Sequence, residues 1–401
     1  MAGYTANQPF VRNRTTWIAY ILLAIYAYFL NILGPITPYL QDELSLSYTL
    51  SGLHFSAFAV GILVVGLTGN LLIRRTGRQL ALSIGAIGVG GSALLLTVGR
   101  SPIVTIGAAF LMGCVGSLIL AVVPALLSDE HGEMRSVAIT EANVLSSLVS
   151  ASAALFVGWF ANLGIGWRMA LIFMAVVAVG LGIRILQPNR DRGRDELDHH
   201  SQGRLPAVFW MFWIALVLAV SIEFCMVFWS ADFLESELGL PRSIAVQSVS
   251  IFLAGMILGR LSSSWFLRYM PAHRVVQGSI GLGLFSFLLY WRTENATLGL
   301  VGLALSGLFV ACLYPLLLSI ALGSAGGNTV QAGARATLAS GTAIFALPLI
   351  LGSVADWIGL RGAFSVVAAL FIVLFSLMLV ARRLPSEPDT PTAHHSPSQL
   401  L

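Results

Sequence analysis

The chain has 401 residues, of which 57% are hydrophobic and 10% are charged, and its formal net charge is +4. Soluble proteins carry roughly 25% charged residues, and a globule of this size would lack the polar surface to cover so much apolar material. The composition therefore excludes soluble enzymes, secreted disulfide scaffolds and proteins that bind nucleic acid. It predicts an integral membrane protein in a lipid bilayer.

Six apolar stretches in the first half of the chain predict transmembrane helices. They follow a polar N-terminal segment, residues 1–16, and are separated by arginine, glycine, proline or acidic residues. Each has about the 20 residues or more that a helix needs to cross a hydrocarbon core about 30 Å thick. Together they form a predicted N-terminal six-helix bundle, residues 17–187, with spans at 17–39, 51–73, 79–98, 102–127, 136–162 and 168–187.

A second set of six spans follows a charged linker. The linker, residues 188–206, mixes arginines, acidic residues and histidines, which is typical of a solvated connection. The tail, residues 385–401, is rich in proline, serine and threonine and is predicted to be disordered. The predicted C-terminal bundle, residues 207–384, has spans at 207–232, 244–266, 275–291, 297–321, 333–353 and 362–382.

The arginines are distributed unevenly between the two sides of these spans. Loops and helix ends on the side of the N-terminus hold 17 of the 22 basic residues, and all 22 are arginine. Because positively charged loops stay in the cytoplasm, we expect both termini, the linker and the tail to be cytoplasmic. The pattern predicts a multi-pass protein of the plasma (inner) membrane.

The two halves share a weak internal repeat at an offset of 194 residues. The offset is sustained from the first span to the fifth, which isolated coincidences would not produce. It predicts an all-α membrane protein with twelve transmembrane helices in two parallel six-helix bundles, related by a pseudo-twofold axis along the membrane normal. Matching positions include Leu40 and Leu234, Glu43 and Glu237, Gly61 and Gly255, and Gly113 and Gly307.

A basic loop lies between the second and third predicted spans. It contains Arg74, Arg75, Gly77 and Arg78 and resembles the loop of the form G-x-L-a-D-r-x-G-r in the major facilitator superfamily. The match is partial, because Asn70 stands at the first glycine position and Arg74 at the acidic one. With the repeat and the predicted topology, the chain resembles this superfamily over essentially its whole length.

The resemblance implies a secondary transporter that works by alternating access and needs no cofactor. It also implies that helices 1, 4, 7 and 10 line a central cavity, with a small-molecule substrate held near the membrane midplane. The fifth span lacks the G-x-x-x-G-P-x-x-G pattern of proton-driven drug antiporters in this superfamily, so the subfamily stays open. We expect the protein to be a monomer.

Polar and aromatic residues recur at helical spacing in the predicted cavity helices. Tyrosine and asparagine can hydrogen-bond a solute, and aromatic rings pack on its apolar surfaces. For Asn31 and Tyr314, a hydrogen bond between helices is an equal alternative. The predicted substrate-cavity residues are Tyr20, Tyr28, Asn31, Ser117, Trp213, Ser230 and Tyr314.

Glu223 is the predicted proton-coupling residue. It lies 16 residues after Ala207, so at 1.5 Å per residue it is roughly 24 Å into a core about 30 Å thick, in the outer half. Apart from Glu141, near a helix end, it is the only carboxylate well inside a predicted span. A carboxylate at such depth normally faces a wet cavity or a partner, and desolvation favours its protonated form. The alternative is a structural hydrogen bond to a neighbouring helix.

Two further sets of residues are predicted to form gates. Glu141 and Arg260 lie near the cytoplasmic ends of helices 5 and 8, which face each other in the superfamily, so their ion pair would close the inner side in the outward-open state. Arg335 is the repeat equivalent of Glu141, and both could instead only reach the cytoplasmic surface. On the outer side, His54 and Asp356 are predicted to meet, with an isolated surface histidine as the alternative.

The sequence therefore predicts a secondary active transporter of a small organic solute, coupled to protons. The alternatives are an exporter (antiporter) of drugs or metabolites and a facilitative uniporter. A chain without lysine has no P-loop, which excludes transport driven by its own ATP hydrolysis. An enzyme or a metal site is disfavoured because the sequence has no catalytic or metal-ligand constellation, and a channel because it has no charge rings or carbonyl filter.

Overall fold

The computed structural model describes residues 11–132, 135–186, 205–267, 269–325 and 329–381, and these ranges contain α-helices and no β-strand. The predicted tail and most of the predicted linker lie outside the described residues. The N-terminal half contains α1 (Arg14–Asn31), α2 (Leu33–Leu44), α3 (Tyr48–Thr76), α4 (Arg78–Val98), α5 (Pro102–His131), α6 (Arg135–Asn162) and α7 (Arg168–Leu186). The C-terminal half contains α8 (Ala207–Ser236), α9 (Arg242–Phe266), α10 (Ala272–Arg292), α11 (Ala296–Val310), α12 (Leu313–Gly323), α13 (Thr329–Ala363) and α14 (Ser365–Ala381).

Ten helical segments in the described ranges are long and apolar enough to cross a membrane. In this set α1 with α2, and α11 with α12, each make one crossing. Helix α14 is also apolar but has 17 residues, and α10 lies outside the set of ten. The composition and the helices together make the chain an integral, multi-pass, all-α membrane protein.

Prolines account for the two broken crossings. Pro35 and Pro315 have no N–H to donate to the carbonyl groups four residues earlier, at Asn31 and Ala311. Helix α1 ends at Asn31 itself, and α11 ends at Val310, one residue before Ala311. The chain then continues as α2 and α12, respectively. The predicted spans 17–39 and 297–321 are therefore each interrupted near the middle.

Side-chain caps fix where several helices begin. The first N–H groups of a helix lack intrahelical partners, and a side-chain oxygen just before the helix can accept a hydrogen bond from one of them. The capping pairs are Asn13 with the N–H of Thr16, Ser47 with that of Leu50, and Asn295 with that of Leu298.

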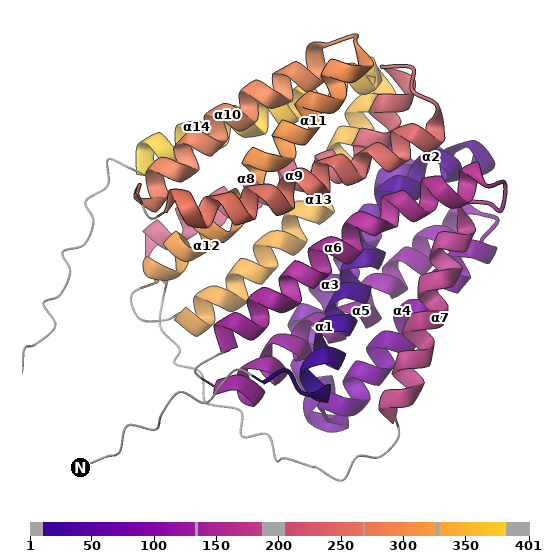
Figure 1. Cartoon of the computed structure of the whole chain (residues 1–401), viewed down its shortest axis with the longest axis vertical. Helices are drawn as coiled ribbons and strands as arrows, with labels where there is room; N and C mark the ends of the chain where they lie inside the picture. The colour runs from indigo at the N-terminus through magenta and orange to yellow at the C-terminus, as the bar shows by residue number, and fades with distance from the viewer. Residues whose placement is uncertain (1–10, 133–134, 187–204, 268, 326–328, 382–401) are drawn as a thin grey trace, which may run out of the picture.

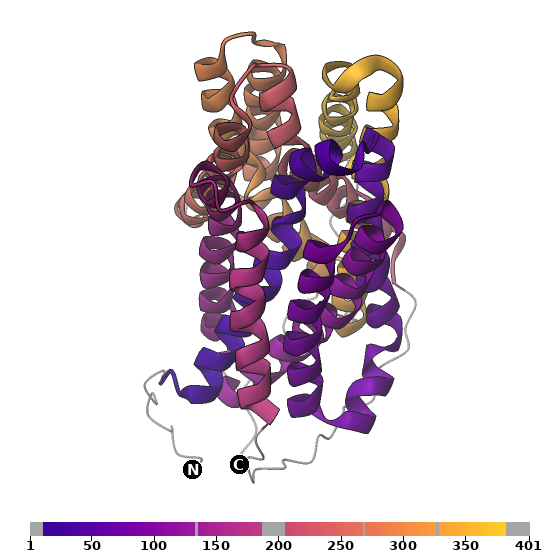
Figure 2. The ribbon, with the colours of Figure 1, turned by 90° about the vertical axis from the view of Figure 1, so that its right-hand side faces the viewer.

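The two halves of the chain pack side by side as two groups of helices (Figure 1). The axes of the long helices in both groups are roughly aligned with one another, as the second view shows (Figure 2). Helices α2, α3 and α6 of the first half contact α8, α13 and α9 of the second. We call the plane of contact between the halves the seam.

The internal repeat appears as a repeated contact inside the two halves. A Cβ atom at Gly113 on α5 would lie 2.0 Å from the carbonyl oxygen of Phe58 on α3. At the positions 194 residues later, a Cβ atom at Gly307 on α11 would lie 2.1 Å from the carbonyl oxygen of Phe252 on α9. The glycines therefore let equivalent pairs of helices approach closely, as small residues do in membrane bundles.

Gly113→Ala is expected to destabilise the protein by about 1–3 kcal/mol, because the helices must move apart to admit the new methyl group. Gly107 lies on the same helix with nothing within 4 Å of its Cβ position, so Gly107→Ala is the matched control. The apparent Tm of the purified protein should fall for Gly113→Ala and stay unchanged or rise for the control. Equal Tm values for the two variants would contradict the close approach.

The seam is closed at one end of the molecule. We call this end the far face, where α2 and α8 end and α3 and α9 begin; the near face is where α1 and α8 begin. At the far face Arg242 on α9 forms an ion pair with Asp42 on α2. Asp356 on α13 accepts hydrogen bonds from the N–H groups of Tyr48 and Thr49 at the start of α3, at 2.8 and 2.9 Å.

Aromatic packing closes the seam just inside these polar contacts. The ring of Phe55 on α3 stacks on that of Phe228 on α8, with centroids 4.0 Å apart. Phe55 also meets Trp229 edge-on, and both phenylalanines are fully buried. Gly34 allows α2 to come within contact of the α8 backbone, because a Cβ there would lie 2.5 Å from the carbonyl oxygen of Val227.

Candidate functional site

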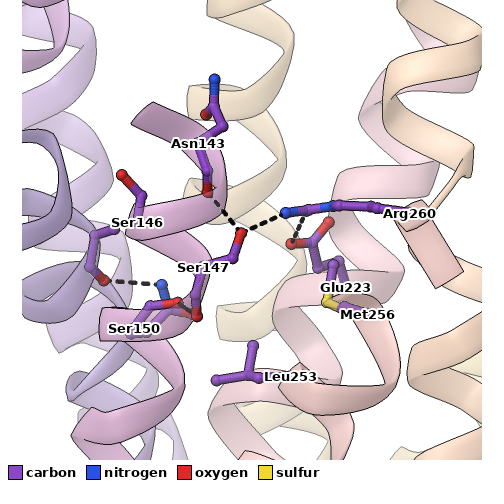
Figure 3. Close-up of a pocket in the computed structure, with 10 residues that line it drawn as sticks. Asn143, Ser146, Ser147, Ser150, Glu223, Leu253, Met256 and Arg260 are labelled. Atoms are coloured by element: carbon purple, nitrogen blue, oxygen red, sulfur yellow. Dashed lines mark hydrogen bonds and ion pairs between the residues drawn. The ribbon is translucent and has the colours of Figure 1, made fainter. Parts of the chain in front are cut away.

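A cavity of about 140 Å³ lies in the seam, between the two halves of the chain. Figure 3 shows polar side chains of the first half facing a charged pair of the second. Helices α1, α6, α8 and α9 supply the lining, so the cavity would change shape if the halves moved relative to each other. The lining residues are Ala27, Asn31, Asn143, Ser146, Ser147, Ser150, Glu223, Leu253, Met256 and Arg260.

Helix α6 presents a polar stripe to this cavity. Asn143, Ser146, Ser147 and Ser150 recur at helical spacing within an otherwise apolar helix. The serine hydroxyls donate to carbonyl groups three or four residues earlier on α6, at 2.8–3.0 Å. Each hydroxyl still has lone pairs with which it can accept a hydrogen bond from a solute.

The charged pair consists of Glu223 on α8 and Arg260 on α9, 3.9 Å apart. Arg260 also donates a hydrogen bond of 2.9 Å to the hydroxyl of Ser147, so it links the two halves across the seam. The Glu223 side chain is 17% exposed and that of Arg260 is 40% exposed. This ion pair is long and partly wet, so it can exchange partners at low cost.

Glu223 lies midway along its helix and not in the outer half of the membrane span, where the sequence-based prediction placed it. Helix α8 runs from Ala207 to Ser236, so 16 residues precede Glu223 from the helix start and 13 follow it. The predicted span ended at residue 232, which placed the midpoint too early. The same extension places Asp232, the last residue of the predicted span, about one turn before the end of α8.

Glu141 pairs with a different arginine from the one predicted. In this conformation its carboxylate binds the Arg12 guanidinium, with 2.8 Å from Nε to Oε2, and accepts a hydrogen bond of 3.1 Å from Tyr20. The hydrogen bonding of Arg12 to the Glu141 carboxylate is the main cause that raises the pKa of Arg12. The Arg335 side chain is exposed, and its backbone carbonyl accepts a hydrogen bond of 2.8 Å from the indole of Trp213.

Of the seven predicted substrate-cavity residues, Asn31 alone lines the described cavity. Glu223, the predicted proton-coupling residue, lines it as well. Its amide donates to the carbonyl of Ala27 at 2.9 Å, which leaves the amide oxygen available. The other predicted residues lie away from this cavity, on α1, α5, α8 and α12. Tyr28 is buried and donates to the Ala170 carbonyl on α7, Ser117 is buried and donates to the Gly113 carbonyl, Ser230 is buried, and Tyr314 is partly buried.

The predicted outer gate is wrong in one of its members. His54 is buried inside the first half, with Nε2 2.9 Å from the hydroxyl of Thr105 and Nδ1 3.0 Å from the Leu50 carbonyl. It cannot meet Asp356, because its ring points at α5 and not at the seam. Asp356 does cross the seam, but its partners are the first N–H groups of α3.

Comparison with known proteins decides the family. The family model described as Major Facilitator Superfamily matches residues 19–328, which is more than half of the chain. The chain belongs to the major facilitator superfamily. An uncharacterised MFS-type transporter of Yersinia pestis is 26% identical over 171 residues, which is 41% of this chain and 44% of that protein. This match spans less than half the length of that relative.

Solved transporters of the superfamily share the fold at low sequence identity. A bacterial homologue of the human lysosomal transporter Spinster, inward-facing and occupied, has a TM-score of 0.76 at 14% identity, covering 94% of this chain and 98% of that one. The nucleoside transporter NupG has a TM-score of 0.74 at 14% identity, covering 92% and 98%. The xylose transporter XylE from E. coli, partially occluded and inward open, has a TM-score of 0.73 at 13% identity, covering 92% and 97%. Membership of this superfamily points to transport rather than enzymatic catalysis, and the solved structures show the shared fold.

The superfamily's basic loop is a tight turn in this member. Gly77 has φ +82°, a conformation that favours glycine, and it ends α3 and begins α4. Arg78 forms an ion pair with Asp129 near the end of α5, and Arg75 is exposed. The backbone of Arg74 lies in α3, but its side chain is outside the described part of the structure.

Proposed function

We propose that the chain is a proton-coupled secondary transporter of a small polar solute, in which two bundles rock about the seam. The observation that carries the proposal is the Glu223–Arg260 pair in a cavity shared by both halves. Ionisable side chains inside membrane spans are costly and mark transport pathways or proton relays. A group whose charge changes at the seam alters the free energy of the motion that opens and closes it.

The proposed architecture has twelve spans in two parallel six-helix bundles, at 17–187 and 207–384. Adding α10 and α14 to the ten long apolar segments gives this number. An even number of spans and the excess of arginines on the near face favour an inner-membrane protein with both termini and the 188–206 linker in the cytoplasm. The protein is proposed to act as a monomer. Labelling of an introduced cysteine in that linker from the cytoplasmic side checks this orientation.

We propose that this structure represents the inward-facing conformation of the transporter. The far face is closed by Asp42 with Arg242, by Asp356 and by the aromatic contacts behind them. The Arg260 side chain stays 40% exposed although its helix packs against α6, which is the exposure expected of a cavity open to solvent. Inward-facing structures of the Spinster homologue and of XylE have the same fold.

The proposed coupling is a competition for Arg260. When Glu223 is ionised, its carboxylate neutralises the guanidinium, and the pair has no net charge. When Glu223 binds a proton, Arg260 keeps its charge, and the N–H that faces Glu223 can donate to an acceptor group of the solute instead. Asn31, Asn143 and the α6 serines then supply further hydrogen bonds. Proton binding and solute binding would thereby favour each other.

A thermal-shift screen followed by uptake tests the function. Because a ligand of the folded state raises Tm, purified protein is screened against nucleosides, pentoses including xylose, carboxylates and amino acids. The compound with the largest shift is then followed in proteoliposomes. We expect its accumulation under an imposed pH gradient and only equilibration without one. Uptake that ignores the gradient would contradict proton coupling and indicate the uniporter alternative.

A further inference from the structure

A second cavity lies at the far face, beyond the closed part of the seam. Its volume is about 370 Å³, and α2, α3, α8 and α9 supply its lining. It shares no lining residue with the central cavity. The residues that line it are Pro38, Gln41, Asp42, Tyr48, Asp232, Glu235, Ser236 and Arg242.

Asp232 is the unusual member of this set. Its side chain lines the cavity, yet the residue is only 4% exposed, and its Oδ2 atom has no hydrogen-bond partner among the described residues. It lies nine residues after Glu223 on the same helix, so roughly 14 Å further along α8. An ionised carboxylate in such a position is costly unless it is paired and hydrogen-bonded.

The one cation that lines this cavity is already shared by two other acids. Arg242 binds Glu235 through Nε at 2.8 Å and forms an ion pair with Asp42 across the seam. The face of the Tyr39 ring also lies 5.6 Å from its guanidinium. The single positive charge of Arg242 is therefore already outnumbered by these two carboxylates, so it cannot also neutralise a third.

The other titratable groups near Asp232 do not compensate a negative charge. Tyr48 on α3 and Tyr290 on α10 interact with it electrostatically, and a neutral phenol carries no charge. Asp356 on α13 interacts with Tyr48 and binds the start of α3. Ser236 donates to the backbone carbonyl of Asp232 rather than to its carboxylate. With Asp42 and Glu235 ionised and Arg242 positive, the lining already carries one net negative charge, and ionisation of Asp232 would add a second.

We propose that Asp232 is a second proton-binding site, loaded from the far face and independent of Glu223. With the far face closed, the Asp232 carboxyl holds a proton. When Arg242 separates from Asp42 and water enters, the carboxyl can release that proton to the solvent. The inference rests on the proposed function only for this opening of the far face. It follows that a lower pH on the far side shifts the conformational equilibrium toward the state in which the far face is closed.

Infrared spectroscopy of the purified protein tests the site without a solute. The carbonyl band of a protonated carboxylic acid should be lost in Asp232→Asn and shifted in Asp232→Glu, which keeps the acid. Glu223→Gln should leave this band in place. If the spectra of Asp232→Asn and Asp232→Glu showed the same carboxylic-acid bands as the wild type, the proposal would be overturned.

A distance measurement tests the consequence for the gate. Spin labels at Leu163 and Glu294, exposed residues after α6 and before α11, report the width of the far face. The closed fraction should rise as the pH falls in the wild type and in Glu223→Gln. In Asp232→Asn it should stay high at every pH. A pH response of Asp232→Asn equal to that of the wild type would contradict the gating role, whatever the outcome of transport assays on Glu223.

Discussion

Glu223→Gln is expected to abolish accumulation of the solute under a pH gradient while leaving exchange of the solute intact. Glutamine keeps the size and hydrogen bonding of the protonated carboxyl but cannot titrate. A gradient of one pH unit supplies about 1.4 kcal/mol per proton, so the wild type should concentrate the solute about tenfold when one proton is coupled. The variant should reach only equal concentrations on both sides.

Exchange of labelled for unlabelled solute is the internal control for this variant. It requires binding and the rocking motion but no net proton transfer, so Glu223→Gln should exchange at a rate near that of the wild type. Glu294→Gln, the same change at an exposed loop position, should affect neither measurement. Tenfold accumulation by Glu223→Gln would exclude Glu223 as the coupling site and direct attention to Glu141.

Arg242→Gln is expected to open the far face. The change removes an ion pair to Asp42 across the seam and the contact with the Tyr39 ring. The Arg242 side chain is 29% exposed and that of Asp42 is 64% exposed, so solvent screening limits the loss to about 1 kcal/mol. A change of this size shifts a two-state equilibrium roughly fivefold. The distance between labels at positions 163 and 294 should lengthen accordingly.

Arg168→Gln is the matched control for this gate. Arg168 on α7 also forms an ion pair at the far face, with Glu43 on α2, and its guanidinium also stacks on an aromatic ring, that of Trp167. Both of its partners belong to the first half, so Arg168→Gln loosens one bundle but removes no ion pair that crosses the seam. If Arg168→Gln and Arg242→Gln lengthened the distance equally, the effect would come from local loosening and not from a gate.

Much of the fold could be predicted because it depends on local chemistry. Apolar length and arginine placement marked the spans, and the 194-residue offset anticipated that Gly113 and Gly307 would occupy equivalent places. Helix breaks were less accessible. Pro35 and Pro315 lie inside long apolar runs, and the length and overall hydropathy of each run predict one continuous span. The end of α8 was also placed too early, at residue 232, which moved Glu223 outward and made Asp232 the last residue of the predicted span.

The candidate site was only partly predictable because helical spacing shows which residues share a face and not what that face meets. Glu223 stood out as a charge in an apolar span, but its pairing with Arg260 depends on how α8 and α9 pack. The α6 stripe was visible as Asn143, Ser146, Ser147 and Ser150, yet the cavity was expected on other helices. His54 was expected at the seam, but its side chain faces α5, whereas that of the neighbouring Phe55 faces α8.

The most direct test of the central claim is the pH inside proteoliposomes when the solute found by thermal shift is added outside without an imposed gradient. An entrapped pH dye should report acidification that accompanies uptake by the wild type and is absent in Glu223→Gln. Alkalinisation would indicate exchange of the solute for protons, as in an antiporter, and would retain the coupling. Uptake of the solute by the wild type with no change in internal pH would contradict proton coupling through the Glu223–Arg260 pair.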